Sequence, residues 1–341
     1  MAKTENIVEK TDTLKGKIVK VEGLVKRYGS NYAVNDISFE ISEGEIVGLL
    51  GPNGAGKSTT MNILTGYLSS TSGAAYINGI DIFENPIEAK KYVGFLPEQP
   101  PVYADMTVRE YLNFVYELKG CEFDREAHIG EIMEVTRITD VKDRLIKNLS
   151  KGYRQRVGIA EALVGDPKLI VFDEPTVGLD PKQILEVRNL IRNLAKNHTV
   201  ILSTHILQEV QAVCERVIIM NKGKIIADAK TDEIVRTIEG GYHYRIKLVG
   251  PQKDIVSALE GINGIKKVTP TNERDADSYA YILEMDKGVD VRKPIFKMCA
   301  ERGYAILGLM PDDSDLESVF IRLVDGSDGI GVSKNAKRRR G

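Results

Sequence analysis

The chain has 341 residues, enough for about two domains with a sizeable core. Hydrophobic residues make up 42% and charged residues 28%, which is an ordinary globular composition. A formal net charge of -2 provides no basic field for nucleic acid, so no nucleic-acid partner is expected. The three cysteines are far apart, which argues against a CxxC zinc site or a disulfide framework and fits a reducing cytosol.

The N-terminal segment is polar, and we expect residues 1–17 to be disordered. It lacks the apolar core of a signal peptide. No segment approaches the roughly 20 apolar residues that a membrane helix needs. If the protein works at a membrane, we therefore expect it to act from the cytoplasmic side.

Buried strands alternate with helices in the next part of the chain. Residues 18–39 alternate like a strand, and three apolar runs predict buried parallel strands at 46–50, 169–172 and 200–202. An apolar helical face follows the second run, made of Ile184, Val187, Ile191 and Leu194. Asp180 and Pro181 suit the start of that helix, as a cap and a first-turn residue. This alternation predicts an α/β core with active loops at the carboxyl ends of its strands.

A mostly helical insertion is predicted at about residues 100–165. One of its helices places Val108, Leu112, Val115 and Leu118 on one side. The character of the sequence changes again after about residue 240. Strands are predicted at 244–248, 265–268, 279–284 and 305–309, with helices at 255–259 and 291–302. The order strand-helix-strand-strand-helix-strand predicts a small ferredoxin-like α+β domain.

A phosphate-binding loop follows the first apolar run. Residues 51–58 read GPNGAGKS and match the GxxxxGK[ST] pattern, between a strand and a helical pattern. Its glycines let backbone N–H groups converge on phosphate oxygens, and the helix N-terminus adds positive charge. Lys57 is expected to neutralise the β- and γ-phosphates, and Ser58 to offer its hydroxyl to Mg²⁺. The nucleotide-binding residues predicted here are Gly51, Pro52, Asn53, Gly54, Ala55, Gly56, Lys57, Ser58 and Thr59.

Two acids end the second apolar run. Asp173 is placed at the mouth of a buried strand, near Mg²⁺, while Glu174 points elsewhere because neighbours in an extended chain face opposite sides. Glu174 is thus predicted to polarise the water that attacks the γ-phosphate. Taken alone, a solvent-facing acidic turn before Pro175 explains the pair equally well. The preceding phosphate-binding loop favours the catalytic interpretation.

His205 alone among the four histidines follows a predicted core strand. There it can hydrogen-bond the γ-phosphate and hold Glu174 and the water in line. His128, His198 and His243 look like ordinary surface or loop residues. A histidine at the end of a strand is more often structural, so the catalytic role of His205 depends on a family argument.

Residues 149–156 supply that argument. They read LSKGYRQR, shortly before the second apolar run, and resemble the ABC signature LSGGQ followed by a basic residue. With the phosphate-binding loop, the two acids and the later histidine in this order, residues 18–235 resemble an ABC transporter nucleotide-binding domain. Lys151 and Tyr153 depart from the signature, but Ser150 and the Gly152 backbone, which make the phosphate contacts, remain.

The resemblance implies further site residues. Tyr28 resembles the aromatic residue that stacks on adenine. Gln99 resembles the glutamine that senses Mg²⁺ and contacts the transmembrane partner, so it joins Ser58 and Asp173 as an expected metal-site residue and Glu174 and His205 as a catalytic one. Asp180 resembles part of the loop that crosses the dimer interface.

The resemblance also implies the fold and the domain organisation. We expect an α/β P-loop NTPase core of the ABC ATPase fold, with an N-terminal antiparallel β subdomain and a helical subdomain. The expected division is an ATPase domain at 18–238, an α+β accessory domain at 239–324 with a last helix at 316–324, and a disordered basic tail at 325–341.

The function implied is ATP binding and hydrolysis in an ABC transporter. Residues 315–320 resemble the ending of ATPases in the type-two exporter group, which work with separate membrane permeases. The expected partners are such a permease and a second ATP-binding subunit, with ATP and Mg²⁺ as cofactors. The alternative is a soluble ABC ATPase that acts on ribosomes or nucleic acid; the single cassette, the absence of long heptads and the near-neutral charge count against it.

Overall fold

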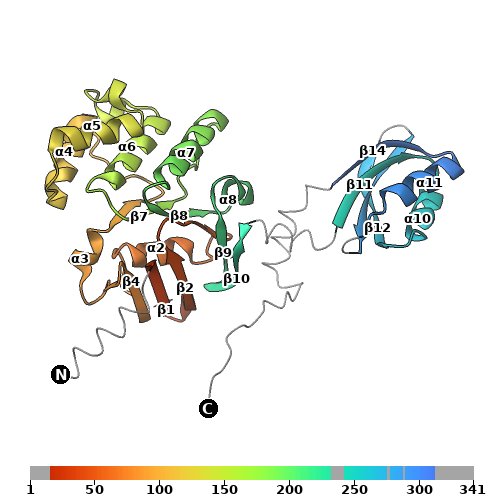
Figure 1. Cartoon of the computed structure of the whole chain (residues 1–341), viewed down its shortest axis with the longest axis horizontal. Coiled ribbons are helices and arrows are strands. Elements are labelled where there is room, and N and C mark those ends of the chain that lie inside the picture. Colours follow the sequence, from red (N-terminus) through yellow and green to blue (C-terminus); the bar gives the residue numbers. More distant parts are fainter. Residues whose placement is uncertain (1–15, 232–241, 275–276, 287–288, 312–341) are drawn as a thin grey trace, which may run out of the picture. The chain divides into compact units, whose positions relative to one another are not determined.

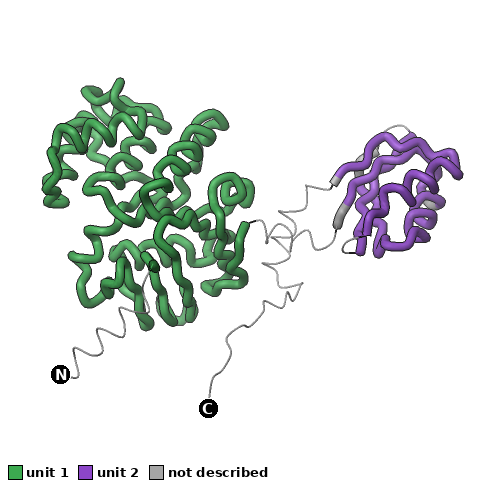
Figure 2. The backbone as a smooth tube through the Cα atoms, viewed as in Figure 1, with its two compact units in different colours: residues 1–231, 332–341 green, residues 232–331 purple. Residues whose placement is uncertain are grey.

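The computed structural model describes residues 16–231, 242–274, 277–286 and 289–311. The chain divides into two compact units, residues 1–231 with 332–341 and residues 232–331 (Figure 2). The expected boundary at residue 238, the last helix at 316–324, the ending at 315–320 and the tail at 325–341 all lie outside the described residues. The first strand begins at Lys17, at the end of the segment expected to be disordered.

A six-stranded sheet forms the centre of the first unit (Figure 1). In sheet order its strands are β10 (Lys224–Lys230), β9 (Arg216–Asn221), β3 (Ile46–Leu50), β8 (Thr199–Thr204), β7 (Leu169–Asp173) and β6 (Val93–Leu96). All neighbours run parallel except β10, which pairs antiparallel with β9. Every residue of β3, β7 and β8 is buried, which confirms the three predicted apolar strands.

A second sheet carries the N-terminal strands. Its order is β2 (Asn31–Ser42), β1 (Lys17–Tyr28), β4 (Ser72–Ile77) and β5 (Ile80–Asp81). All of its pairings are antiparallel, as expected for the N-terminal β subdomain. Its buried side chains join those of β3 and the helix that follows β3 in one core, so this sheet packs directly beside the phosphate-binding loop.

Helices cover the first unit, and α4, α5, α6 and α7 gather at the end away from β1 and β2 (Figure 1). They are α2 (Lys57–Leu64), α3 (Pro86–Lys90), α4 (Val108–Lys119), α5 (Arg125–Val135), α6 (Lys151–Leu163), α7 (Pro181–Leu194) and α8 (Leu207–Val213), with short 3₁₀ turns at Thr139–Val141 and Ile146–Asn148. The predicted helical insertion therefore contains α4, α5 and α6.

The predicted apolar face of α4 is correct except at its last position. Val108, Leu112 and Val115 are buried, whereas Leu118 is 73% exposed. A rotation of 100° per residue carries Leu118 to the edge of the buried stripe. It also lies in the last turn, which the left-handed residue Gly120 ends. On α7, the predicted start is confirmed: Asp180 caps the helix by accepting from Gln183 N–H, and Pro181 is its first residue.

The second unit is a four-stranded antiparallel sheet with two helices. Its elements are β11 (Tyr242–Val249), α10 (Gln252–Glu260), β12 (Ile265–Arg274), β13 (Ser278–Met285), α11 (Arg292–Arg302) and β14 (Ala305–Pro311). The sheet order β12-β13-β11-β14 places the first strand between the third and the fourth. This is the ferredoxin-like arrangement that the sequence predicts. No helix in the described residues is long and apolar enough to cross a bilayer.

A chain that ends at Thr231 is expected to fold and to bind ATP as tightly as the full chain. The described strands of the second unit pair only with one another and enclose a core of their own, so the first unit loses no sheet neighbour. Circular dichroism and calorimetric titration with ATP would test this. A well-folded truncated chain without ATP affinity would contradict the expectation.

Candidate functional site

The loop between β3 and α2 has the backbone of a phosphate cradle. Gly54 and Gly56 have φ values of 80° and 104°, in the region that favours glycine. A Cβ on Gly56 would lie 2.4 Å from the carbonyl oxygen of Ala33, so a side chain is excluded there. Gly56 is also the N-cap of α2. The first N–H groups of a helix have no partner within the helix, so this end suits an anion.

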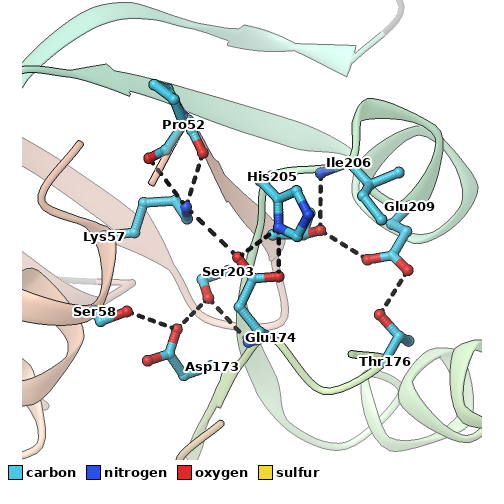
Figure 3. A network of polar contacts seen from close by, with 12 residues as sticks. Pro52, Lys57, Ser58, Asp173, Glu174, Thr176, Ser203, His205, Ile206 and Glu209 are labelled. Atoms are coloured by element: carbon cyan, nitrogen blue, oxygen red, sulfur yellow. Dashed lines mark hydrogen bonds and ion pairs between the residues drawn. The ribbon is translucent and has the colours of Figure 1, made fainter. Parts of the chain in front are cut away.

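Lys57 begins α2 and is only 6% exposed. Its ammonium group donates to the carbonyl oxygen of Gly51 over 2.8 Å and lies 3.5 Å from Glu174 Oε1 (Figure 3). The contact brings together a cation from the phosphate-binding loop and a carboxylate from the end of β7. Both are nearly buried, which strengthens their interaction relative to one at the surface.

Ser58 and Asp173 present two oxygen atoms to one another. Ser58 Oγ donates to Asp173 Oδ1 over 3.2 Å, and Ser203 Oγ donates to the same carboxylate oxygen. Hard oxygen donors suit Mg²⁺, and two ligands at neighbouring octahedral positions lie about 3 Å apart when each is ~2.1 Å from the metal. The Ser58 and Asp173 oxygens have this spacing. These residues therefore fit a magnesium ion.

Glu174 points away from Asp173, but not for the reason expected from an extended chain. Its φ is 49°, a left-handed conformation that costs on the order of 1–3 kcal/mol for a residue with a side chain. The turn is held by the Glu174 N–H group, which donates to Ser203 Oγ over 3.0 Å and contacts the Ser203 carbonyl oxygen at 3.3 Å. The strained turn directs the carboxylate to Lys57 and His205.

His205 follows β8 directly, and its side chain is 44% exposed. Its Nδ1 atom lies 3.1 and 3.0 Å from the two carboxylate oxygens of Glu174. If Nδ1 carries the proton and donates to Glu174, then Nε2 is the free acceptor in the neutral ring. His128 and His198 instead bond to Gly165 N–H and to the Pro167 carbonyl oxygen, which suits structural roles; the side chain of His243 is not described.

The signature residues form a second cluster, at the starts of α6 and α7. Ser150 is the N-cap of α6 and accepts from the Tyr153 N–H group over 3.4 Å. Gly152 is buried against Gln183 of α7, and a Cβ there would lie 2.7 Å from that side chain. Asp180 caps α7 by accepting from the Gln183 N–H group. Ser150, Gly152 and Asp180 therefore lie close together.

The two residues that depart from the signature have their own contacts. Tyr153 donates from its hydroxyl to Asp140 Oδ2 over 2.7 Å. The Lys151 side chain passes over Gly178, so that a Cβ added to Gly178 would lie 2.1 Å from the Lys151 ammonium nitrogen. Neither contact involves Ser150, which is the N-cap of α6.

Tyr28 and Gln99 do not join either cluster in the described residues. Tyr28 ends β1, pairs with Asn31 and is 49% exposed, with the Lys26 ammonium group 5.3 Å from its ring centre. The hairpin it belongs to reaches the phosphate-binding loop through Ala33, next to Gly56. Gln99 is exposed just beyond the end of β6. Neither makes a hydrogen bond to Lys57, Ser58 or Asp173.

Sequence reasoning missed the buried polar residues that support these side chains. Ser203 bonds to Asp173 and Glu174, and Thr204, Thr176 and Glu209 form a further buried group (Figure 3). A signal was present for Ser203 and Thr204, because two polar residues directly follow the apolar run at 200–202. Glu209 gave no such signal, since an acid in the first turn of a helix is common.

The fold and the site together define a P-loop NTPase. The family model described as "ABC transporter" matches residues 34–177. The bacitracin transport ATP-binding protein of Bacillus licheniformis is 32% identical over 311 residues, 91% of this chain and 98% of that protein. An uncharacterized ABC transporter ATP-binding protein of Bacillus subtilis (strain 168) is 38% identical over 308 residues, 90% of this chain and 99% of that protein.

A solved structure agrees with these relatives. A dimeric ATP-binding cassette in a post-hydrolysis state, bound to ADP and Pi, superposes with a TM-score of 0.57 at 28% identity and covers 62% of this chain and 98% of that one. The chain belongs to the ABC transporter ATP-binding proteins. It is the ATP-binding and ATP-hydrolysing subunit of an ABC transporter, and the relatives do not favour the alternative function on ribosomes or nucleic acid.

Proposed function

We propose that this chain hydrolyses ATP at Glu174 to drive export through a separate permease. The observation that carries the proposal is the Glu174 carboxylate, held between Lys57 and His205 at the carboxyl edge of the central sheet. This edge is where open α/β sheets bind their ligands. A role in transport is supported by the similarity to a bacitracin transport protein, and the exporting direction by the resemblance of residues 315–320 to the ending of type-two exporter ATPases.

The named residues divide the hydrolysis of ATP between them. The backbone of residues 51–56 and the Lys57 ammonium group bind the phosphates, with Thr59 in the first turn of α2 and Tyr28 beneath the adenine. Ser58 and Asp173 would hold Mg²⁺, with Gln99 as a further metal-site residue, and the metal would offset phosphate charge when bound. Glu174 accepts a hydrogen bond from the attacking water and takes its proton as the oxygen bonds to the γ-phosphorus. The bond from that phosphorus to the bridging oxygen breaks, which gives ADP and phosphate.

His205 orients this step from the other side of Glu174. Donation from Nδ1 holds the carboxylate, while Nε2 is left for the water or, in the protonated ring, for a γ-phosphate oxygen. Lys57 then moves from its contact with Glu174 to the phosphates, because a phosphate group is the stronger competitor for the ammonium group. Glu174 is thereby released to act as a base.

A second copy completes each site. Ser150 and Gly152 lie at the start of α6, whose N–H groups and dipole favour an anion. We propose that two chains meet head to tail, so that these groups of one chain close over the γ-phosphate bound by Lys57 of the other. Asp180 crosses the interface beside them. The dimeric cassette that superposes on this chain supports the pairing of two chains.

The permease is expected to bind near Gln99 and the helical subdomain, which places the protein on the cytoplasmic face of a membrane through that partner. ATP-driven closure of the dimer then moves the helical subdomain, and the permease follows. Co-purification of the full chain with a polytopic membrane protein encoded beside it tests this. Recovery with ribosomes instead would contradict it.

Mixing two inactive variants is expected to restore hydrolysis. In Lys57→Ala the phosphates lose their cation, and in Ser150→Arg the second chain can no longer close the site, so neither variant turns over ATP alone. A mixed dimer contains one site with both Lys57 and Ser150. Phosphate release measured in a titration of one variant into the other would show the recovery, and a strictly inactive mixture would contradict the head-to-tail site.

A further inference from the structure

Glu209 of α8 is a buried carboxylate that the proposed chemistry does not use. It is 3% exposed. Its Oε1 atom accepts from the Thr176 hydroxyl over 2.6 Å, and its Oε2 atom accepts from the Thr204 hydroxyl over 2.7 Å (Figure 3). The Arg188 guanidinium group of α7 lies 3.8 Å from Glu209 Oε1. A buried charge is tolerated only when it is paired and hydrogen-bonded, and Glu209 meets both conditions.

The partners of Glu209 belong to the segments that carry the reacting groups. Thr176 lies two residues after Glu174, in the turn that leads to Asp180. Thr204 directly precedes His205, and its Oγ1 atom also accepts from the Ile206 N–H group over 3.0 Å. Glu209 therefore fastens the loop after Glu174 to the loop that carries His205.

Glu209 forms the second of two cross-links between these loops. The first is Ser203, which bonds to Asp173 and to the Glu174 N–H group at the ends of the strands. Glu209 repeats the connection farther along both loops. Both cross-links adjoin the contact of Glu174 with His205, since Glu174 lies two residues before Thr176, and His205 lies between Thr204 and Glu209.

Nothing in the packing of α8 itself requires an acid at this position. The neighbouring residues Leu207, Val210 and Val213 are buried and apolar. Burial raises the pKa of the nearby Cys214 thiol to about 12, with the Glu209 carboxylate as the second cause. The surroundings are therefore poorly solvated, and hydrogen bonds made there are strong and directional.

We propose that Glu209 is a positioning residue for hydrolysis: it couples the interface loop at Thr176 to the histidine loop at Thr204 and so sets the approach of His205 to Glu174. The proposal rests on the proposed function of Glu174 and His205. It adds that dimer closure around Asp180 is communicated to His205 through this carboxylate. Both hydroxyls are needed, because either one alone leaves a loop unattached.

The test removes one hydroxyl at a time. Thr176→Val and Thr204→Val keep the side-chain shape, and Thr176→Ser and Thr204→Ser keep the hydroxyl. Thr136→Val is the matched control, since Thr136 is 1% exposed and donates to the Ile132 carbonyl oxygen over 2.7 Å, within the helical subdomain. Each chain is measured at full length for kcat and KM with ATP, for affinity toward the β,γ-imido analogue of ATP, and for melting temperature.

The expected result is a loss of turnover without a loss of binding. Each valine variant is expected to lower kcat by about tenfold or more, since small displacements of reacting groups are costly, while analogue affinity stays within about twofold. The double valine variant is expected to lose little more than either single variant, because one missing hydroxyl already breaks the coupling. The serine variants regain most of kcat, and Thr136→Val keeps the parent kcat at a similar melting temperature.

Two results would overturn the positioning role. One is a kcat for Thr176→Val and Thr204→Val within about twofold of the parent. The other is a loss of kcat in Thr136→Val that equals theirs at equal melting temperature. Glu174→Gln, measured in parallel, separates this inference from the proposed function. Its failure to lose turnover would refute the role of Glu174, whereas an inactive Glu174→Gln beside fully active Thr176→Val and Thr204→Val refutes only the coupling.

Discussion

Glu174→Gln is expected to bind ATP as the parent does and to lose turnover by about 10²- to 10⁴-fold, the usual contribution of a general base. The amide keeps the shape of the side chain and a hydrogen bond to His205, but it takes no proton from water. ATP then persists between two chains, so the variant is expected to accumulate as a closed dimer. Phosphate release and light scattering after size-exclusion chromatography in MgATP measure both effects.

A second substitution tests whether the dimer of Glu174→Gln is the closed one. Adding Ser150→Arg places a large cation at the start of α6, where the other chain must approach, and is expected to return the protein to monomers. Glu186→Gln serves as the matched carboxylate-to-amide change, because Glu186 pairs with Arg156 away from the phosphate-binding loop. A monomeric Glu174→Gln in saturating ATP would contradict the closed dimer, as would a double variant that dimerises equally well.

The sequence predicts the position of Glu174 more reliably than its conformation. Four apolar residues followed by Asp173 fix β7, and a strand so placed ends at the phosphate-binding loop in any parallel sheet of this kind. The direction of the carboxylate, in contrast, depends on a left-handed turn held by Ser203 of another strand. Local pattern carries no information on a partner 29 residues away. The same limit explains why Glu209 was missed.

The second unit was predictable for a related reason. Its strands alternate in hydrophobicity because one face packs on α10 and α11 while the other does not, and this period is legible in a single sequence. The order of strands then follows from right-handed crossovers between short elements. Leu118 shows what a helical pattern does not predict. Whether the last residue of an apolar face is buried depends on which other elements pack against it, and the sequence of α4 alone does not say which these are.

Lys57→Ala is expected to weaken ATP binding by roughly 10- to 100-fold, because a hydrogen bond to a charged group contributes about 1.5–3 kcal/mol and each 1.4 kcal/mol is about tenfold in affinity. Lys57 is the one cation in the described phosphate-binding loop, and the backbone N–H groups remain. The change also leaves Glu174, 8% exposed, with His205 but without its ammonium partner. We therefore expect a lower melting temperature as well.

The loss of affinity and the loss of stability can be separated by changing both residues of the pair. Calorimetric titration with ATP measures the affinity, and thermal unfolding measures the melting temperature. In Lys57→Ala with Glu174→Gln no unpaired carboxylate is buried, so the melting temperature is expected to recover while the affinity stays low. Lys20→Ala is the control, since Lys20 pairs with Glu22 on β1 over 2.8 Å, outside the loop. It is expected to leave affinity unchanged. An undiminished affinity in Lys57→Ala would mean that the loop between β3 and α2 is not the phosphate site. The substitution removes the one cation of that loop and leaves its backbone in place.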